Sequence, residues 1–323
     1  MNRAVLKKCI VETRLLFASI FALLFAFCWM RVYIVSTLEI NDFAAIVERL
    51  WDKWGQFSPV SLSQLLSYSG RIAIGYDEPI VVFGVSIFAI ARGSDAVSGE
   101  LNRGTLELLL AQPVSRLQVL YSQAAVTIVC LALLALATWL GTWTGIQTNT
   151  VIESIPPPSL KIPGLGISIP LAFGEPEKIF VPMRDRVNPQ DFIPGAFNLF
   201  CLGCALAGVS TFVSACDRYR WRTIGIVVAL YVLHLMLKIV GLAIPRLHVL
   251  RDLSLFSAYE PQHFIAMAVQ TPEQAWSLAM FDSQGVFVEP GPLGYNLILL
   301  GVAAVGYLAA GLVFHKRDLP APL

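Results

Sequence analysis

The stretch RGSDAVSGELNRGTLELLLAQPVSR, residues 92–116, is a short charged segment between two long apolar stretches. Six of its side chains carry charge: Arg92, Asp95, Glu100, Arg103, Glu107 and Arg116. A charge at the centre of a bilayer costs about 2.5 to 3.5 kcal/mol on insertion scales, so such side chains favour water. We therefore expect residues 92–123 to form a hairpin in water at one face of a membrane.

The rest of the chain has the composition of a polytopic membrane protein. Its 323 residues are 56% hydrophobic and 14% charged, with a mean hydropathy of +0.67, which is far too apolar for a water-soluble globule. A helix needs about 20 mostly apolar residues to cross the ~30 Å hydrocarbon layer. Six stretches reach that length, so we expect an all-α fold with six transmembrane helices: about 15–35, 74–97, 124–145, 195–215, 221–244 and 293–314.

The distribution of lysine and arginine predicts that both termini and the hairpin are cytoplasmic. The segments placed inside hold 12 Lys/Arg and 6 Asp/Glu, whereas the other loops hold 9 and 16 over roughly twice the length. Residues 1–16 place apolar side chains on one helical face and Lys7, Lys8 and Arg14 opposite, which predicts a separate helix in the headgroup plane. The six-helix transmembrane domain then covers residues 17–323.

Three long loops are expected outside, at 36–73, 146–194 and 245–292. The second contains so many prolines that a long helix is excluded, and we expect extended chain with short strands around 165–173. In the third, Thr271-Pro-Glu-Gln274 resembles a capping box, which predicts a helix over about 272–281. These loops are large enough to form a small cap on the bundle.

Sequence signals of catalysis are missing. No Gly-x4-Gly-Lys-Ser/Thr motif occurs, so the chain does not bind a nucleotide in the P-loop manner and is not an ATPase or other enzyme on its own. No metal site is expected, because the histidines are scattered and Cys201 and Cys204 lie within an apolar helix without a second pair. No basic patch with interleaved aromatics points to nucleic acid.

The hairpin resembles a known signature. Asp95 with Ser98-Gly-Glu100, then Arg103-Gly-Thr-Leu-Glu-Leu-Leu-Leu110 and Pro113-Val-Ser-Arg116, is similar to the segment between helices two and three of type-2 ATP-binding-cassette (ABC) exporter permeases. The ending Phe314-His-Lys-Arg-Asp-Leu319 is similar to the tail of that family after helix six. The external loops are longer and richer in proline than the common family pattern.

The resemblance implies that the hairpin carries a coupling helix docked on a separate ATPase. Residues 105–111 can form two helical turns, ended by Gln112-Pro113. The residues assigned to ATPase coupling are Glu100, Arg103, Thr105, Leu106, Glu107, Leu109, Leu110, Pro113 and Arg116. Glu100 and Arg103 are expected in a charged network, and Leu106, Leu109 and Leu110 in apolar contacts with the ATPase.

The resemblance further implies a complex of two permease copies, or one copy with a paralogue, and two ATPase subunits that bind ATP and Mg²⁺. This chain itself binds no cofactor. The substrate path would be lined by helices two and five, and Tyr231, His234 and Lys238 share one face of helix five. Lys238 could instead extend to the outer headgroups, because it lies only seven residues before Pro245.

Two functions follow from these observations. The first is the membrane subunit of an ATP-driven exporter in a lipid bilayer, which we expect to be the bacterial inner membrane. The alternative is a membrane assembly or maturation factor, in which ATPase strokes act on an external accessory protein through the long loops.

Overall fold

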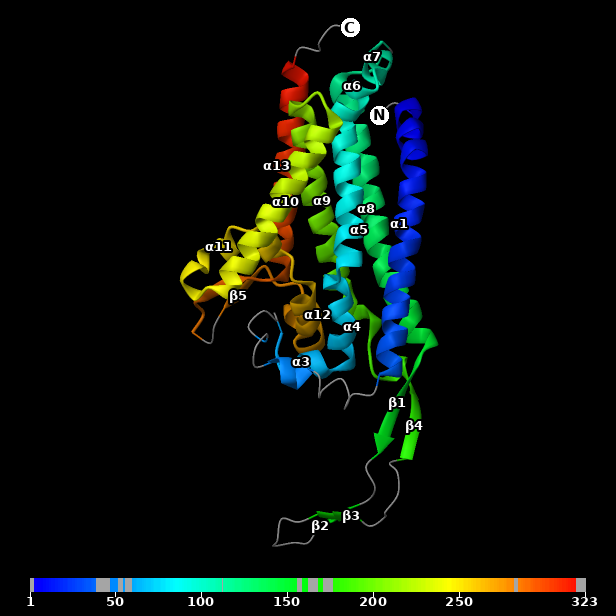
Figure 1. Ribbon diagram of the computed structural model, residues 1–323, viewed down its shortest axis with the longest axis vertical. Helices are drawn as coiled ribbons and strands as arrows, with labels where there is room; N and C mark the ends of the chain where they lie inside the picture. The colour runs from blue at the N-terminus through cyan, green and yellow to red at the C-terminus, as the bar shows by residue number, and fades with distance from the viewer. Residues whose placement is uncertain are drawn as a thin grey trace.

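The computed structural model describes residues 3–38, 47–51, 55, 60–111, 113–155, 159–161, 168–170, 177–281 and 284–317. Within them the protein is mostly helical, and six helices are long and apolar enough to cross a membrane, which confirms the six expected helices. They form an elongated bundle (Figure 1). The six are α1 (Arg3–Thr37), the segment Tyr68–Asn102, α8 (Arg116–Thr148), α9 (Ile193–Cys216), α10 (Arg220–Ala243) and α13 (Pro292–Lys316).

The two ends of the bundle differ. The start of α1, the end of α13 and two short helices, α6 (Glu100–Asn102) and α7 (Thr105–Leu110), lie at one end, which we call the hairpin end (Figure 1). Strands β1 (Thr150–Ile155) and β4 (Glu177–Pro182) project from the opposite end, which we call the ribbon end (Figure 1).

Helix α1 differs from the expected arrangement. No break separates residues 3–16 from the first span, and the helix continues for 35 residues, about 50 Å. No glycine or proline occurs within it to interrupt the backbone. Part of the face expected to rest on headgroups is instead buried in the protein, since Val5, Cys9 and Thr13 are each at most 3% exposed, and Val5 and Cys9 pack against Val114 and Val126. Ile10, on the same face, is 56% exposed.

The second span is interrupted twice. Helix α4 (Tyr68–Asp77) ends before Pro79, which begins α5 (Pro79–Ser94), because proline supplies no N–H for the preceding turn. A π-helical turn, Asp95–Gly99, then joins α5 to α6. The short helix α3 (Leu62–Leu66) precedes α4 and begins with a capping box between Ser61 and Gln64.

Small residues allow close packing of the spans. Helix α9 lies in the middle of the largest apolar core, which includes side chains of every span. A Cβ on Gly306 of α13 would lie 2.5 Å from the backbone of Gly208 in α9, and a Cβ on Gly141 of α8 would lie 2.4 Å from the carbonyl oxygen of Phe25 in α1. Such approaches of two backbones are typical of membrane helix pairs.

The proline-rich loop forms no long helix in its described part, as expected. Strands β1 and β4 pair antiparallel from Thr150↔Pro182 to Ile155↔Glu177, and we call this pair the ribbon. Strands β2 (Ser159–Lys161) and β3 (Ser168–Pro170) also pair, which confirms a strand within the expected 165–173 region. Residues 162–167 and 171–176 lie outside the described chain. Two 3-10 turns, Met183–Asp185 and Pro189–Phe192, lead into α9.

The predicted helix over 272–281 is wrong. Only a 3-10 turn, Pro272–Gln274, forms there, followed by β5 (Ala279–Phe281), which pairs with β6 (Phe287–Pro290). The hydroxyl of Thr271 donates back to Met267 O and does not cap the residues ahead. The helices of this loop lie earlier: α11 (Val249–Asp252) and α12 (Pro261–Gln270), with 3-10 turns at Pro245–Leu247 and Leu255–Ala258.

Candidate functional site

The hairpin projects from the second span as two short helices joined by a tight turn. Helix α6 ends at Asn102, and α7 begins at Thr105. Between them Gly104 has a φ of +69°, a left-handed conformation that side-chain-bearing residues rarely adopt. The glycine thus permits the reversal of the chain that forms α7.

A charged cluster lies at the base of this hairpin, and Asp95 is one of its two anionic centres. Its Oδ1 accepts a hydrogen bond from Arg103 Nη1 at 2.6 Å and lies 3.5 Å from Arg220 Nη1. Its Oδ2 lies 3.5 Å from Arg92 Nη1. The hydrogen bond to Asp95 raises the pKa of Arg103 above its ordinary value.

Glu100 is the second anionic centre and is completely buried. Its Oε1 accepts a hydrogen bond from Lys8 Nζ at 2.7 Å and lies 3.1 Å from Arg103 Nη2, while its Oε2 accepts from the hydroxyl of Thr105. Two carboxylates therefore join α1, the second span, the hairpin and α10. We define the charged cluster as Lys8, Arg92, Asp95, Glu100, Arg103 and Arg220.

The expectation that all charges of the hairpin lie in water is wrong for three of them. Arg92 and Asp95 are each 5% exposed and Glu100 is 0% exposed. Burial of a charge is costly unless opposite charges and hydrogen bonds compensate it. Here Lys8 and Arg220, from elements remote in the sequence, supply that compensation.

The π-helical turn is fixed by a serine of α9. Ser214 Oγ accepts hydrogen bonds from the backbone N–H groups of Val97 and Ser98, at 3.1 and 2.9 Å, and its hydroxyl donates to Ser94 O at 3.0 Å. Ser98 Oγ also lies 3.1 Å from Thr223 Oγ1 of α10. π-helical turns often occur at functional sites, and this one connects the hairpin to α9 and α10.

The leucines of α7 do not share one environment. Leu106 is 1% exposed and belongs to an apolar core with Val97, Leu120 and Phe314, so it anchors α7 to its own chain. Leu109 is half-buried. The side chains of Glu107 and Leu110 lie outside the described part. Of the described leucines assigned to ATPase contacts, Leu109 alone keeps an accessible surface.

The return of the hairpin is tied to the end of α13. Arg116 Nη1 donates to Arg317 O at 2.6 Å, and Ser115 caps α8 through a capping box with Gln118. Pro113 is exposed just before this cap. Arg116 therefore holds the last turn of α13 against the start of α8, and Pro113 stays on the surface.

The proposed path residues of α10 lie in two settings. Tyr231 and His234 line a cavity of about 340 Å³ between α9, α10 and α13. Lys238 does not line it, because its Nζ donates to Phe256 O at 2.8 Å and to Tyr259 O at 3.1 Å and lies 3.7 Å from Glu260 Oε1. The side chain thus binds the chain's own loop and does not extend to the outer headgroups.

Several residues that hold this loop were missed from the sequence. Glu260 is 8% exposed and pairs with Arg251 at 3.1 Å, while the Asn198 side chain binds Ala258 O and the N–H of Glu260. The hydroxyl of Tyr259 donates to Tyr76 O at 2.6 Å. Polar residues such as Asn198 within an apolar span are the only sequence signal for these contacts.

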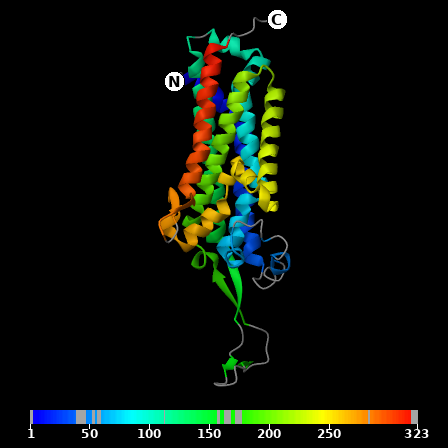
Figure 2. The same cartoon turned by 90° about the vertical axis from the view of Figure 1, so that its left-hand side faces the viewer.

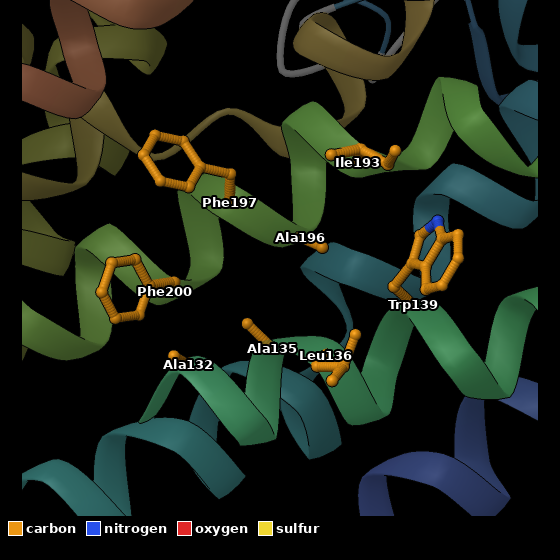
Figure 3. Close-up of a pocket in the computed structure, with 8 residues that line it drawn as sticks. All are labelled: Ala132, Ala135, Leu136, Trp139, Ile193, Ala196, Phe197 and Phe200. Carbon is orange, nitrogen blue, oxygen red and sulfur yellow. The ribbon is translucent and has the colours of Figure 1, made fainter. Parts of the chain in front are cut away.

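Figure 3 shows a further pocket, of about 410 Å³, between α8 and α9. Trp139, Ile193, Phe197 and Phe200 surround it together with small alanines. The indole N–H of Trp139 donates to Pro189 O at 2.9 Å. None of the lining residues is titratable, so this pocket offers apolar contact and no chemistry.

One group of carboxylates has the spacing of a metal site. Ligand oxygens of Glu12, Asp95 and Glu100 lie within 4.8 Å of one another. However, Lys8 contacts both Glu12 and Glu100, and Arg103 contacts both Asp95 and Glu100. The positions that a cation would take are thus held by ammonium and guanidinium groups, and the geometry fits an ion-pair network.

Six helices long and apolar enough to cross a membrane, with a second span that ends in a clamped charged hairpin, are the architecture of a polytopic membrane protein. The sequence comparison agrees, since the model of the ABC-2 family of transporter proteins matches residues 13–319. The chain belongs to that family and is an integral membrane subunit of an ABC transporter. Membership implies an ABC ATPase partner and often a dimeric assembly. No curated protein matches the sequence.

Proposed function

We propose that this chain is the membrane half of an ATP-driven exporter, in which two permeases pair with two ATPase subunits at the hairpin end. The charged cluster is the observation that carries this proposal. A surface loop has no need of two buried carboxylates held by four cations from different helices. A hairpin that transmits force does need such a rigid base, because a force on α7 must reach the spans without bending the hairpin.

The cluster also indicates which spans the force would move. Glu100 connects the hairpin to α1 through Lys8, and Asp95 connects it to α10 through Arg220. Closure of an ATPase dimer would then shift α1, α5 and α10 together as rigid elements. Helices α5 and α10 contact each other through Phe83 and Tyr231, with ring centroids 6.2 Å apart. Their joint movement would open a path toward the ribbon end.

The proposal is tested by co-expression with the partner ATPase. Leu109→Arg changes a half-buried side chain of α7 that is not a member of the charged cluster. We expect it to weaken co-purification of the ATPase by about tenfold or more, as truncated interface anchors do. Leu278→Arg, at a 60% exposed leucine near the ribbon end, serves as a matched control. Full co-purification of Leu109→Arg would contradict docking through α7.

A second function, remodelling of an external protein, is favoured by the ribbon. Phe180 is 69% exposed on β4, while Val151 and Val181 pack the base of the ribbon into an apolar core. An ion pair between Arg186 and Glu153 also fixes the base. A rigid ribbon with an exposed aromatic ring is suited to transmit movement of the spans to a partner outside the bundle.

The two functions are separated by shortening the ribbon. Residues 156–176 are replaced by Asn-Gly, a turn that joins two paired strands, here at the pair Ile155↔Glu177. The core residues Met183, Val187 and Phe192 remain in place. An exporter keeps substrate-stimulated ATP hydrolysis after this change. An assembly factor loses binding of its external partner, which is measured by co-purification of that partner with the permease after crosslinking at the outer surface of intact cells.

A further inference from the structure

The cavity between α9, α10 and α13 is a built site and not a gap between helices. Figure 2 shows α10 standing apart from α13, with α9 between them. The segment Asp252–Phe256 closes the cavity from the ribbon side, and its volume of about 340 Å³ lies in the range of small-molecule pockets.

Three contacts hold that closing segment on α10. Ser254 Oγ donates to His234 O at 2.6 Å, and the N–H of Leu255 donates to His234 Nδ1 at 3.1 Å. The ring of Phe256 packs edge-on against Tyr231, with centroids 4.8 Å apart. These contacts fix one wall of the cavity on α10.

The tautomer of His234 follows from its partner. A backbone N–H only donates, so Nδ1 of His234 accepts and the neutral ring carries its proton on Nε2. The ring therefore still offers a hydrogen-bond donor. Most other residues that line the cavity are apolar, with Val227, Leu230, Ile298 and Val302 among them.

The charged residue that lines the cavity is an acid, Asp252. Asp252 is exposed and lines the cavity, and it forms no ion pair within the part of the chain that the structure describes. Its neighbour Arg251 is engaged by Glu260, at 3.1 Å. No lysine or arginine lines the cavity, so an apolar ligand that carries a positive charge is complementary to it.

We propose that this cavity binds an amphiphile with an apolar body and a protonated amine or quaternary ammonium headgroup, which meets the carboxylate of Asp252. The inference deepens the export function proposed above and rests on it, because it names the chemical class of the cargo. The apolar body lies along α10 and α13.

The test uses the full-length permease without its ATPase, in phosphatidylcholine nanodiscs. Three photoreactive probes share one diazirine-bearing decyl chain and end in trimethylammonium, sulfate or maltoside. The sites of labelling are mapped by peptide mass spectrometry. We expect the ammonium probe to label peptides that contain 227–234 and 298–302, at lower concentration than the other two.

Two variants and two matched controls make the result specific. Asp252→Asn removes the charge, and we expect about three- to tenfold weaker labelling by the ammonium probe, with the maltoside probe unchanged. Leu230→Trp fills the cavity and abolishes labelling by all three probes. Two controls keep wild-type labelling. Glu273→Gln changes another exposed acid of the same loop, and Leu233→Trp changes a leucine of α10 that is 52% exposed and does not line the cavity.

Two results would overturn the inference: equal or stronger labelling by the sulfate probe, or labelling that survives Leu230→Trp. Either result leaves the exporter proposal standing, because ATPase docking is measured separately with Leu109→Arg. In the complete complex, the ammonium compound should stimulate ATP hydrolysis, and Asp252→Asn should raise its half-maximal concentration by the same factor as in labelling.

Discussion

At the scale of single residues, Lys238 shows what a partly buried cation does in this protein. The sequence alone leaves two roles, a path-lining charge and a snorkelling one. In the structure its ammonium group instead satisfies the carbonyls of Phe256 and Tyr259. Phe256 lies in the 3-10 turn Leu255–Ala258 and Tyr259 directly follows it, so the ammonium group fixes the end of this turn on α10. Such a role depends on the tertiary fold and has no signature in the sequence.

The first prediction concerns Lys238→Met. Methionine fills the space but donates no hydrogen bond, so the segment 255–260 loses two of its hydrogen bonds to α10. We expect a lower thermal midpoint and faster backbone hydrogen exchange in that segment, whereas Lys316→Met at the far end of α13 changes neither. Unchanged exchange would show that Lys238 does not anchor the loop. Substrate-stimulated ATP hydrolysis measured in parallel reports on transport.

The second prediction concerns the hydroxyl of Tyr259. Burial raises the pKa of this phenol well above its ordinary value, so it remains a donor to Tyr76 O at the end of α4. Tyr259→Phe leaves that carbonyl unsatisfied, at a cost of about 1 to 2 kcal/mol. Chemical unfolding in detergent measures this loss. Tyr33→Phe, at a 49% exposed tyrosine, is the control and should be neutral within error.

At the scale of elements, length and apolar composition predict the six spans well and their ends poorly. Arg116–Thr148 exceeds the expected 124–145, because a capping box at Ser115 starts the helix earlier. The break at Pro79 falls inside the expected second span, 74–97, and length and composition do not predict it. Helix α12 was missed, since its apolar face packs on α4 and α9 and its ten residues are too short for a span signal.

The third prediction concerns Gly99 of the π-helical turn. A Cβ at this position would lie 2.2 Å from Asp95 Oδ1, so Gly99→Ala displaces the carboxylate from Arg103 and Arg220. We expect a loss of about 3 kcal/mol in stability, at the lower end of the range for a broken buried ion pair, because Arg103 and Arg220 are partly exposed. Gly301→Ala, with no atom within 4 Å of its Cβ, should be neutral or stabilising. Equal stability of both variants would show that the cluster tolerates displacement of Asp95.

At the scale of the whole molecule, the sequence predicts the hairpin but not the partners that hold it. The resemblance assigned Glu100 and Arg103 to a charged network, and the structure places them together, 3.1 Å apart. Lys8 and Arg220 were counted only as positive charges on one side of the membrane. Lys8 lies 92 residues from Glu100 in the chain, a separation that no local pattern reports.

The fourth prediction concerns the orientation of the bundle. Single cysteines at Asn102, exposed at the hairpin end, and Phe180, exposed on the ribbon, are introduced after replacement of the six native cysteines. An impermeant maleimide should label the Phe180 position in intact cells and the Asn102 position only after permeabilisation. Ser98 is buried and is unsuitable as a probe. Labelling of Asn102 from outside would reverse the orientation and refute ATPase docking at the hairpin.

The π-helical turn sets the azimuth of α7 around the axis of the second span. An α-helix advances about 100° per residue, so the extra residue of a π turn rotates everything beyond it by about that amount. Excision of one residue, such as Ala96, would restore regular winding and swing Glu100 away from Lys8. The one additional residue of the π turn therefore determines the direction, around the axis of the second span, in which the hairpin projects.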